Sequence, residues 1–113
     1  MSSNSKAARQ SEGAVVNDCL LALSQAGCLV WRQNTGVLPD KNGRMIRFGL
    51  CVGSSDIVGI APTGHFLAIE CKTALGQPTD AQVRFIAAVK RQGGRAGIAR
   101  CGADAVAIAL SPS

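Results

Sequence analysis

The stretch DIVGIAPTGHFLAIECK, residues 56–72, decides the fold. Two apolar runs, residues 56–61 and 65–72, flank a three-residue turn of Pro62, Thr63 and Gly64. Turn residues between two such runs predict a β-hairpin. Because the runs are apolar on both faces, we expect these strands at the centre of a sheet that is covered on each side.

Charged residues gather at the open end of this predicted hairpin. If the hairpin closes symmetrically about Thr63, Asp56 lies opposite Glu70, since each is seven residues from the centre. Opposed residues share a face of the sheet, and Lys72 points to that face because it lies two residues beyond Glu70. Opposed like charges are destabilising unless something offsets them, and divalent cations bind carboxylate oxygens. The pattern therefore predicts a magnesium site that positions and activates a water, with Lys72 stabilising charge on a phosphate.

A simpler alternative is a surface ion pair between Glu70 and Lys72, with Asp56 opening a turn. The apolar neighbours of Glu70, from Phe66 to Ile69, disfavour this alternative, because charged groups in such a strand are costly without a purpose. The metal site depends on the register of the hairpin, since a slip of one residue would separate the two carboxylates.

The remaining chain predicts helices on either side of further strands. Ser11 and Thr79 are suited to begin helices that end near Ala26 and Gln92, and we expect a loop over residues 34–44. Further strands are predicted over residues 28–33, 45–48 and 96–100, and a last helix over 103–110. We expect a flexible tail over residues 1–10 and a single α/β domain over 11–113, with a central mixed sheet flanked by helices.

Composition limits the classes of partner. The chain has 113 residues, enough for one domain, and its 12 Lys and Arg against 7 Asp and Glu give a net charge of +5. Such a domain favours polyanions: nucleic acid, an anionic membrane surface or an acidic protein. The aromatic fraction of 4% argues against a single-strand binder built on stacked bases. Arg100 and Asp104 interrupt the longest apolar region, so we expect no membrane span and a cytoplasmic protein.

The five cysteines do not predict a zinc site or a disulfide framework. No pair has C-x-x-C spacing, and His65 is the only histidine. A redox or metal-sensing role is therefore disfavoured, and Cys19, Cys28 and Cys71, which lie among apolar neighbours, are expected in the core.

Three of these segments together resemble a known family. Gly53-Ser54-Ser55-Asp56, Ile69-Glu70-Cys71-Lys72 and the helical Gln82 are similar to the PD-(D/E)XK nuclease superfamily, and more narrowly to its VRR-NUC (virus-type replication-repair nuclease) domain. The resemblance runs from about Glu12 to Arg100 and is to a stand-alone form of the domain. It implies a restriction-endonuclease-like α-β-β-β-α-β core. Ser55 departs from the family, which usually has proline before the aspartate.

The resemblance also implies roles for individual residues. Asp56, Glu70 and the main-chain carbonyl of Cys71 correspond to metal ligands, and Lys72 to the lysine that contacts the attacking water or the scissile phosphate. Glu12 corresponds to a glutamate that holds the metal or its waters, although a first-turn acid also suits the helix dipole. Gln82 corresponds to a helical glutamine near the lysine, although it also suits a capping box. The metal would be magnesium, with manganese as a substitute.

Residues expected to contact DNA come from the resemblance and from the distribution of charge. Arg32 and Asn34 are similar to polar positions that end the family's first strand. Other basic residues lie around the second strand and on the helix after Thr79, where a solvated helix face is the alternative: Arg44, Arg47, Arg84, Lys90 and Arg91. They favour shape-directed binding of duplex or branched DNA.

The family suggests an activity as well as a fold. Its stand-alone members act as dimers on four-way (Holliday) junctions, which implies a junction-resolving endonuclease of DNA repair, a homodimer, in a bacterial or phage-infected cell. A non-catalytic DNA-binding or assembly module that keeps the fold is the alternative. The intact set of Asp56, Glu70 and Lys72 favours the enzyme.

Overall fold

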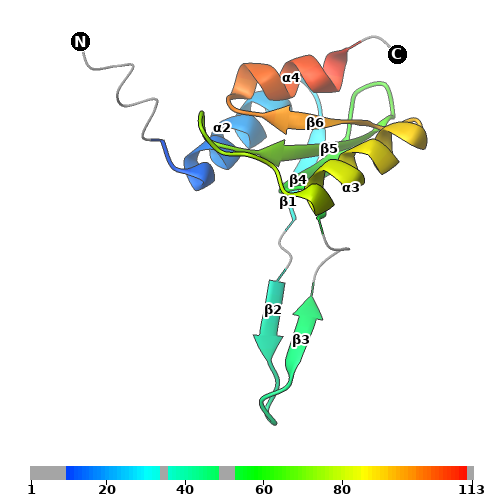
Figure 1. Cartoon of the computed structure of the whole chain (residues 1–113). Coiled ribbons are helices and arrows are strands. Elements are labelled where there is room, and N and C mark those ends of the chain that lie inside the picture. Colours follow the sequence, from blue (N-terminus) through cyan, green and yellow to red (C-terminus); the bar gives the residue numbers. More distant parts are fainter. Residues whose placement is uncertain (1–9, 34–35, 49–52, 112–113) are drawn as a thin grey trace.

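The computed structural model describes residues 10–33, 36–48 and 53–111, and Figure 1 shows their arrangement. In chain order the helices and strands are α2 (Glu12–Gln25), β1 (Leu29–Arg32), β2 (Gly36–Pro39), β3 (Met45–Phe48), β4 (Ile57–Ile60), β5 (Phe66–Cys71), α3 (Asp80–Arg91), β6 (Arg95–Ala99) and α4 (Gly102–Leu110). Four strands form a mixed sheet in the order β1-β4-β5-β6, in which only β5 and β6 run parallel. The predicted α/β fold with a central mixed sheet is confirmed.

Helices cover both faces of this sheet. Apolar side chains of α2 and α4, among them Val15, Leu23 and Ala105, pack with Ile57 and Ile69 on one face. On the other face, apolar side chains of α3 pack against Val58, Ala68 and Ala96. Among the described residues, no helix is long and apolar enough to cross a membrane.

The hairpin of β4 and β5 has the predicted register. Ile57 pairs with Ile69 and Val58 with Ala68, and the Ala61 N–H donates to the His65 carbonyl at 2.9 Å, so Asp56 falls opposite Glu70 at the open end. Both strands lie at the centre of the sheet and are buried, as their apolar faces predicted, except at Ile60 and Phe66 beside the turn. Asp56 and Glu70 therefore meet at one end of the two central strands.

The first helix follows its sequence signals. The Ser11 hydroxyl accepts the N–H of Ala14 at 3.1 Å and begins α2, whose buried Val15, Val16, Cys19 and Leu23 recur at helical spacing. The chain leaves the helix through Gly27, whose φ of 91° suits glycine. Cys28 and Cys71 are also buried, as expected of small core residues. Apart from Gln10, the predicted tail lies outside the described residues.

One prediction is wrong. The segment 34–44 was expected to be a loop, but β2 lies within it and pairs antiparallel with β3. These strands form a sheet of their own, so the strand predicted over 45–48 does not join the main sheet. The Asp40–Gly43 turn connects them: one Asp40 carboxylate oxygen accepts the N–H groups of Asn42 and Arg44, each at 2.8 Å. Gly36 and Pro39 are poor strand formers, but the turn allows cross-strand pairing that overrides their propensity.

Candidate active site

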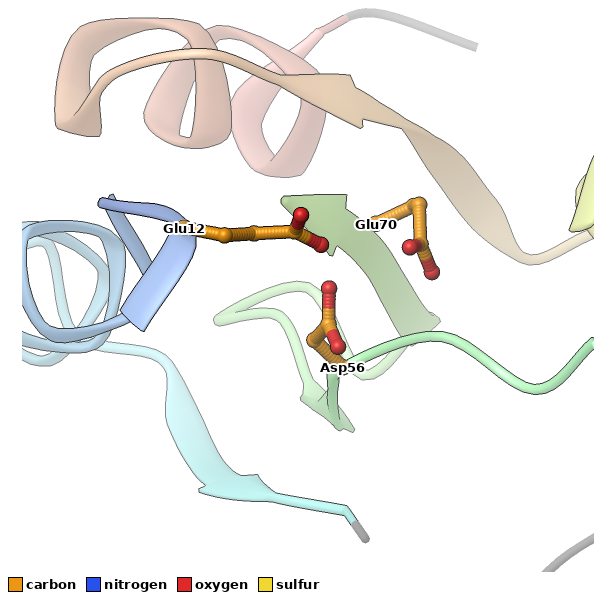
Figure 2. A group of neighbouring side chains, drawn as sticks. All are labelled: Glu12, Asp56 and Glu70. Carbon is orange, nitrogen blue, oxygen red and sulfur yellow. The ribbon is translucent and has the colours of Figure 1, made fainter. Parts of the chain in front are cut away.

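Three carboxylates meet at the end of the sheet where β4 begins and β5 ends. Asp56 precedes β4, Glu70 lies in β5, and Glu12 lies in the first turn of α2. One carboxylate oxygen from each lies within 4.8 Å of the other two. In Figure 2 the Glu12 side chain extends from its helix towards the other two. The structure thus brings together three residues that are far apart in the sequence, including the Glu12 whose role the sequence left open.

Glu70 is the buried member of this group. Its residue is 1% exposed, and its Oε1 has no hydrogen-bond partner among the described residues. Burial, and then the charge of Asp56, raise the pKa of Glu70 to about 8, against a smaller lowering by Lys72. A buried carboxylate with an unsatisfied oxygen beside two other carboxylates fits a hard divalent cation, which would replace the proton that the raised pKa favours.

Asp56 is held by the backbone of the neighbouring strands. One of its carboxylate oxygens accepts the N–H of Cys71 at 2.9 Å, and its carbonyl accepts the N–H of Gln33 at 2.7 Å. The backbone at Cys71 therefore lies against the site, while its buried thiol packs in the core with α2 and α4. That the Cys71 carbonyl binds metal stays a prediction.

Lys72 lies between two of the acids. Its Nζ is 3.5 Å from Glu70 Oε2 and 3.7 Å from Glu12 Oε1, and the residue is 9% exposed. Glu70 and Lys72 thus share the face predicted from their two-residue spacing. One ammonium against three carboxylates leaves an excess of negative charge, which a cation can offset.

Gln82 takes part in the capping box and also contacts the candidate site, so the two positions that the sequence left open are compatible. Its Oε1 accepts the N–H of Thr79 at 2.8 Å, and its own N–H donates to the Thr79 hydroxyl at 3.1 Å, which completes a capping box at the start of α3. Its Nε2 donates to Glu70 Oε2 at 2.7 Å. The amide therefore joins the start of α3 to the buried carboxylate and fixes the orientation of that carboxylate.

Comparison with known proteins shows the family of the chain. The VRR-NUC domain family matches the sequence over residues 15–103. The chain belongs to the VRR-NUC domain family. A solved structure described as a VRR_NUC domain is similar in fold, with a TM-score of 0.60 and 20% sequence identity over 89% of this chain and 97% of that one. No curated protein matches. The recognition from sequence is confirmed, and with it a nuclease-type fold.

The VRR-NUC match contains most of the site. Asp56, Glu70, Lys72 and Gln82 fall inside the matched residues 15–103, whereas Glu12 falls outside them. Gly53, which opens the segment leading to Asp56, has a φ of 83°, and a Cβ there would collide with the backbone of Ala81 in α3. Glycine is therefore required at this position for both its backbone conformation and its close approach to α3.

The residues predicted to contact DNA lie in three places. Arg32 is exposed at the end of β1, next to the segment that leads to Asp56. Arg44 is exposed after the β2–β3 turn and Arg47 lies in β3, while Asn34 is outside the described residues. On α3, which starts beside Glu70, the exposed basic residues are Arg84, Lys90 and Arg91.

Two other arginines bind the protein's own backbone. Arg100 Nη1 donates to the carbonyls of Thr73 at 2.5 Å and Gly76 at 2.7 Å, and so holds the loop that follows Lys72. Arg95 Nη1 donates to the carbonyl of Ala109 at 2.6 Å. The sequence did not predict that Arg100 supports this loop. Its acceptors are main-chain carbonyl oxygens, which every loop has whatever its sequence.

The two functions of Gln82 can be separated by mutation. Gln82→Glu keeps an acceptor suited to the capping box but places an oxygen, in place of the Nε2 donor, against Glu70. If Glu70 is a metal ligand, cleavage should fall by about 10–100-fold, as it does when a group that orients a metal ligand is lost. Thr79→Ala should lower the free energy of unfolding by about 1 kcal/mol and leave cleavage nearly unchanged. Thermal unfolding measures the stability of each variant, and cleavage rates measure its activity. Wild-type cleavage in Gln82→Glu would mean that Gln82 only caps the helix.

Proposed function

We propose that this VRR-NUC domain is a magnesium-dependent endonuclease that hydrolyses phosphodiester bonds in DNA, with manganese able to substitute. The observation that carries the proposal is the buried Glu70, whose Oε1 has no partner among the described residues and whose carboxylate lies beside those of Asp56 and Glu12. A protein does not keep such a group buried without a compensating partner. The chemistry of three carboxylates fits a hard cation of the magnesium type.

The residues have distinct roles in this mechanism. Asp56, Glu70 and Glu12 would hold the metal together with the Cys71 carbonyl, and the bound ion would lower the pKa of a water and offset charge on the phosphate. Asp56 is oriented by the Cys71 N–H, and Glu70 by Gln82. Lys72 supplies a fixed positive charge for the attacking water or for the phosphoryl oxygens as the P–O bond to the leaving strand breaks.

A non-catalytic DNA-binding module with the same fold is the second candidate. It needs the basic surface of Arg32 and α3 but neither the buried Glu70 nor the carboxylates beside it. The Gln82–Glu70 hydrogen bond and the Lys72 ion pairs favour the enzyme, since a module without catalysis has no use for a charged cluster that destabilises the fold. Cleavage of labelled DNA with magnesium or with chelator distinguishes the two.

The proposed substrate is branched DNA, and the first candidate among branched DNAs is the four-way junction of DNA repair. Its support is the family membership together with basic residues that come from the end of β1, the β2–β3 hairpin and α3 rather than from one recognition helix alone. Arg84 lies about 9–11 Å from Lys90 and Arg91 along α3, at the rise of an α-helix, so these cations can contact different phosphates. We place this activity in the cytoplasm of a bacterial or phage-infected cell, which agrees with the free thiols of Cys19, Cys28, Cys71 and Cys101.

We further propose a homodimer, in which a second copy covers an apolar patch of the sheet. The α3 helix packs on β5 and β6, and four large side chains on paired positions of β1, β4 and β5 remain exposed: Leu29, Trp31, Ile60 and Phe66. The patch contains no charged side chain, so two copies of a basic chain can meet there without repulsion. Among the described strands β1 is an edge of the sheet, and its outer backbone groups can pair antiparallel with a second copy about a two-fold axis.

The only tryptophan of the chain lies in this patch and reports the dimer. Trp31 is 46% exposed, so its fluorescence should shift to shorter wavelength as protein concentration rises and the dimer forms. Trp31→Ala should weaken dimerisation at least about 10-fold in sedimentation experiments, since interfacial tryptophans are often hot spots. Leu21→Ala, an exposed apolar change on α2, is the control. An unchanged dimer in Trp31→Ala would exclude this patch.

A further inference from the structure

Residues 36–48, here named the arm, lie apart from the body of the domain. In Figure 1 the two strands of the arm extend away from the main sheet. β2 and β3 pair with each other, and the two cores of buried side chains join the helices to strands of the main sheet. An isolated two-stranded hairpin is marginally stable in water. The arm therefore adds little to the core, and its use must come from something that it contacts.

Both ends of the arm join the body at the candidate active site. Gln33, which precedes the arm, donates its N–H to the carbonyl of Asp56 at 2.7 Å. Gly53, which follows the arm, lies three residues before Asp56 and against α3 at Ala81. The arm is thus inserted in the chain directly beside the proposed metal ligands.

The tip of the arm presents positive charge. Asp40 is its only acid, and one oxygen of this carboxylate is occupied by the backbone N–H groups of Asn42 and Arg44. Lys41 and Arg44 are exposed, and neither forms an ion pair with any residue that the structure describes. Exposed cations on a narrow ribbon complement a polyphosphate backbone.

The dimensions of the arm fit duplex DNA. A two-stranded β-ribbon can enter the major groove. About eight residues separate Gln33 from Lys41, which at ~3.3 Å per residue reaches about 25 Å, or about 7 base pairs of duplex. We infer that the arm extends along the substrate duplex, that its tip enters the major groove, and that Lys41 and Arg44 contact phosphates about 7 base pairs from the cleaved bond. This inference rests on the proposed function, since it takes DNA as the substrate.

The test compares DNA binding by tip variants in chelator, where no cleavage occurs. The double variant Lys41→Ala/Arg44→Ala removes both cations. Met45→Ala, an exposed truncation on the same arm, is the uncharged control, and Lys41→Arg/Arg44→Lys keeps the charge. Each protein is titrated with DNA whose duplex extends either about 4 or about 15 base pairs from the cleavage position. Guanine N7 methylation then maps contacts in the major groove.

We expect the wild type and both controls to bind the longer duplex more tightly and to protect guanines about 7 base pairs from the cut. The double variant should lose this protection and the gain with length, and its salt slope, d log K/d log[salt], should fall in magnitude by about 2. Protection and a length gain that persist in the double variant would overturn the role of the arm. The role of the arm would also be overturned if the double variant changed its sedimentation but not its affinity for DNA, because this result would indicate that the arm contacts a second copy of the chain.

The proposed function can fail separately from this inference. If the wild type binds DNA but never cleaves it with magnesium, the enzyme is excluded, while the chelator experiment still decides the role of the arm. If the double variant binds and protects DNA as the wild type does, the arm has no role while the nuclease stands.

Discussion

Glu70→Gln should abolish DNA cleavage, by at least about 10³-fold, and leave DNA binding intact. The change removes the charge of the carboxylate that is buried between Gln82, Lys72 and the other two acids, but it keeps the size of the side chain. Loss of one preorganised electrostatic group at a reacting centre already costs about 10²–10³-fold, and here the metal is lost with it. Single-turnover cleavage and binding in chelator measure the two effects.

The same variant has an expected effect on stability, which shows that it is folded. Because the pKa of Glu70 is raised to about 8 from 4.5, the folded wild type without metal holds a proton that the unfolded chain releases. Its stability is therefore complete below pH 4.5 and falls as the pH rises towards 8. Glu70→Gln does not have this loss, so without metal it should unfold at a higher temperature than the wild type at pH 8 and at a similar one at pH 4. Full cleavage by Glu70→Gln, or a lower unfolding temperature at pH 8, would refute this role.

Lys72→Met should also abolish cleavage, by about 10²–10³-fold, but for a different reason. Methionine keeps the apolar part of the side chain and removes the ammonium, which lies 3.5 Å from Glu70 and 3.7 Å from Glu12. Because that ammonium competes with a cation for the same carboxylates, magnesium or manganese should bind Lys72→Met at least as tightly as the wild type. Glu70→Gln, in contrast, should lose metal affinity together with cleavage.

Calorimetric titration with manganese, beside cleavage assays, separates these roles. The combination expected for Lys72→Met is normal or tighter metal binding with little cleavage. If Lys72→Met instead loses metal and keeps residual cleavage in proportion to bound metal, Lys72 only organises the acids and does not act on the phosphate. Lys72→Arg is the control that keeps the charge with a different shape.

The central part of the site could be predicted because a short turn fixes it. The Pro62–Gly64 turn sets the register of β4 and β5, and the register alone places Asp56 opposite Glu70. The two-residue spacing from Glu70 to Lys72 then follows from the alternation of a strand. Local geometry of this kind involves few residues, so the pattern in the sequence is sufficient.

Parts of the site that depend on tertiary packing could not be decided from sequence. The approach of Glu12 to Asp56 depends on how α2 packs across the sheet through Val15, Val16 and Leu23. For Gln82, two local patterns seemed to compete, yet the amide has an oxygen for the cap and a nitrogen for Glu70. The β2 strand was missed because Gly36 and Pro39 are poor strand formers, and only pairing with β3 makes that segment extended.

Magnesium-dependent cleavage is the most direct test of the proposed function. Purified protein is incubated with end-labelled linear duplex and four-way junction, with magnesium or with chelator, beside Glu70→Gln. We predict cleavage that requires magnesium, is faster on the junction and is absent in the variant. If folded wild-type protein that binds DNA cleaves neither substrate with magnesium or manganese, the domain is not the nuclease proposed here.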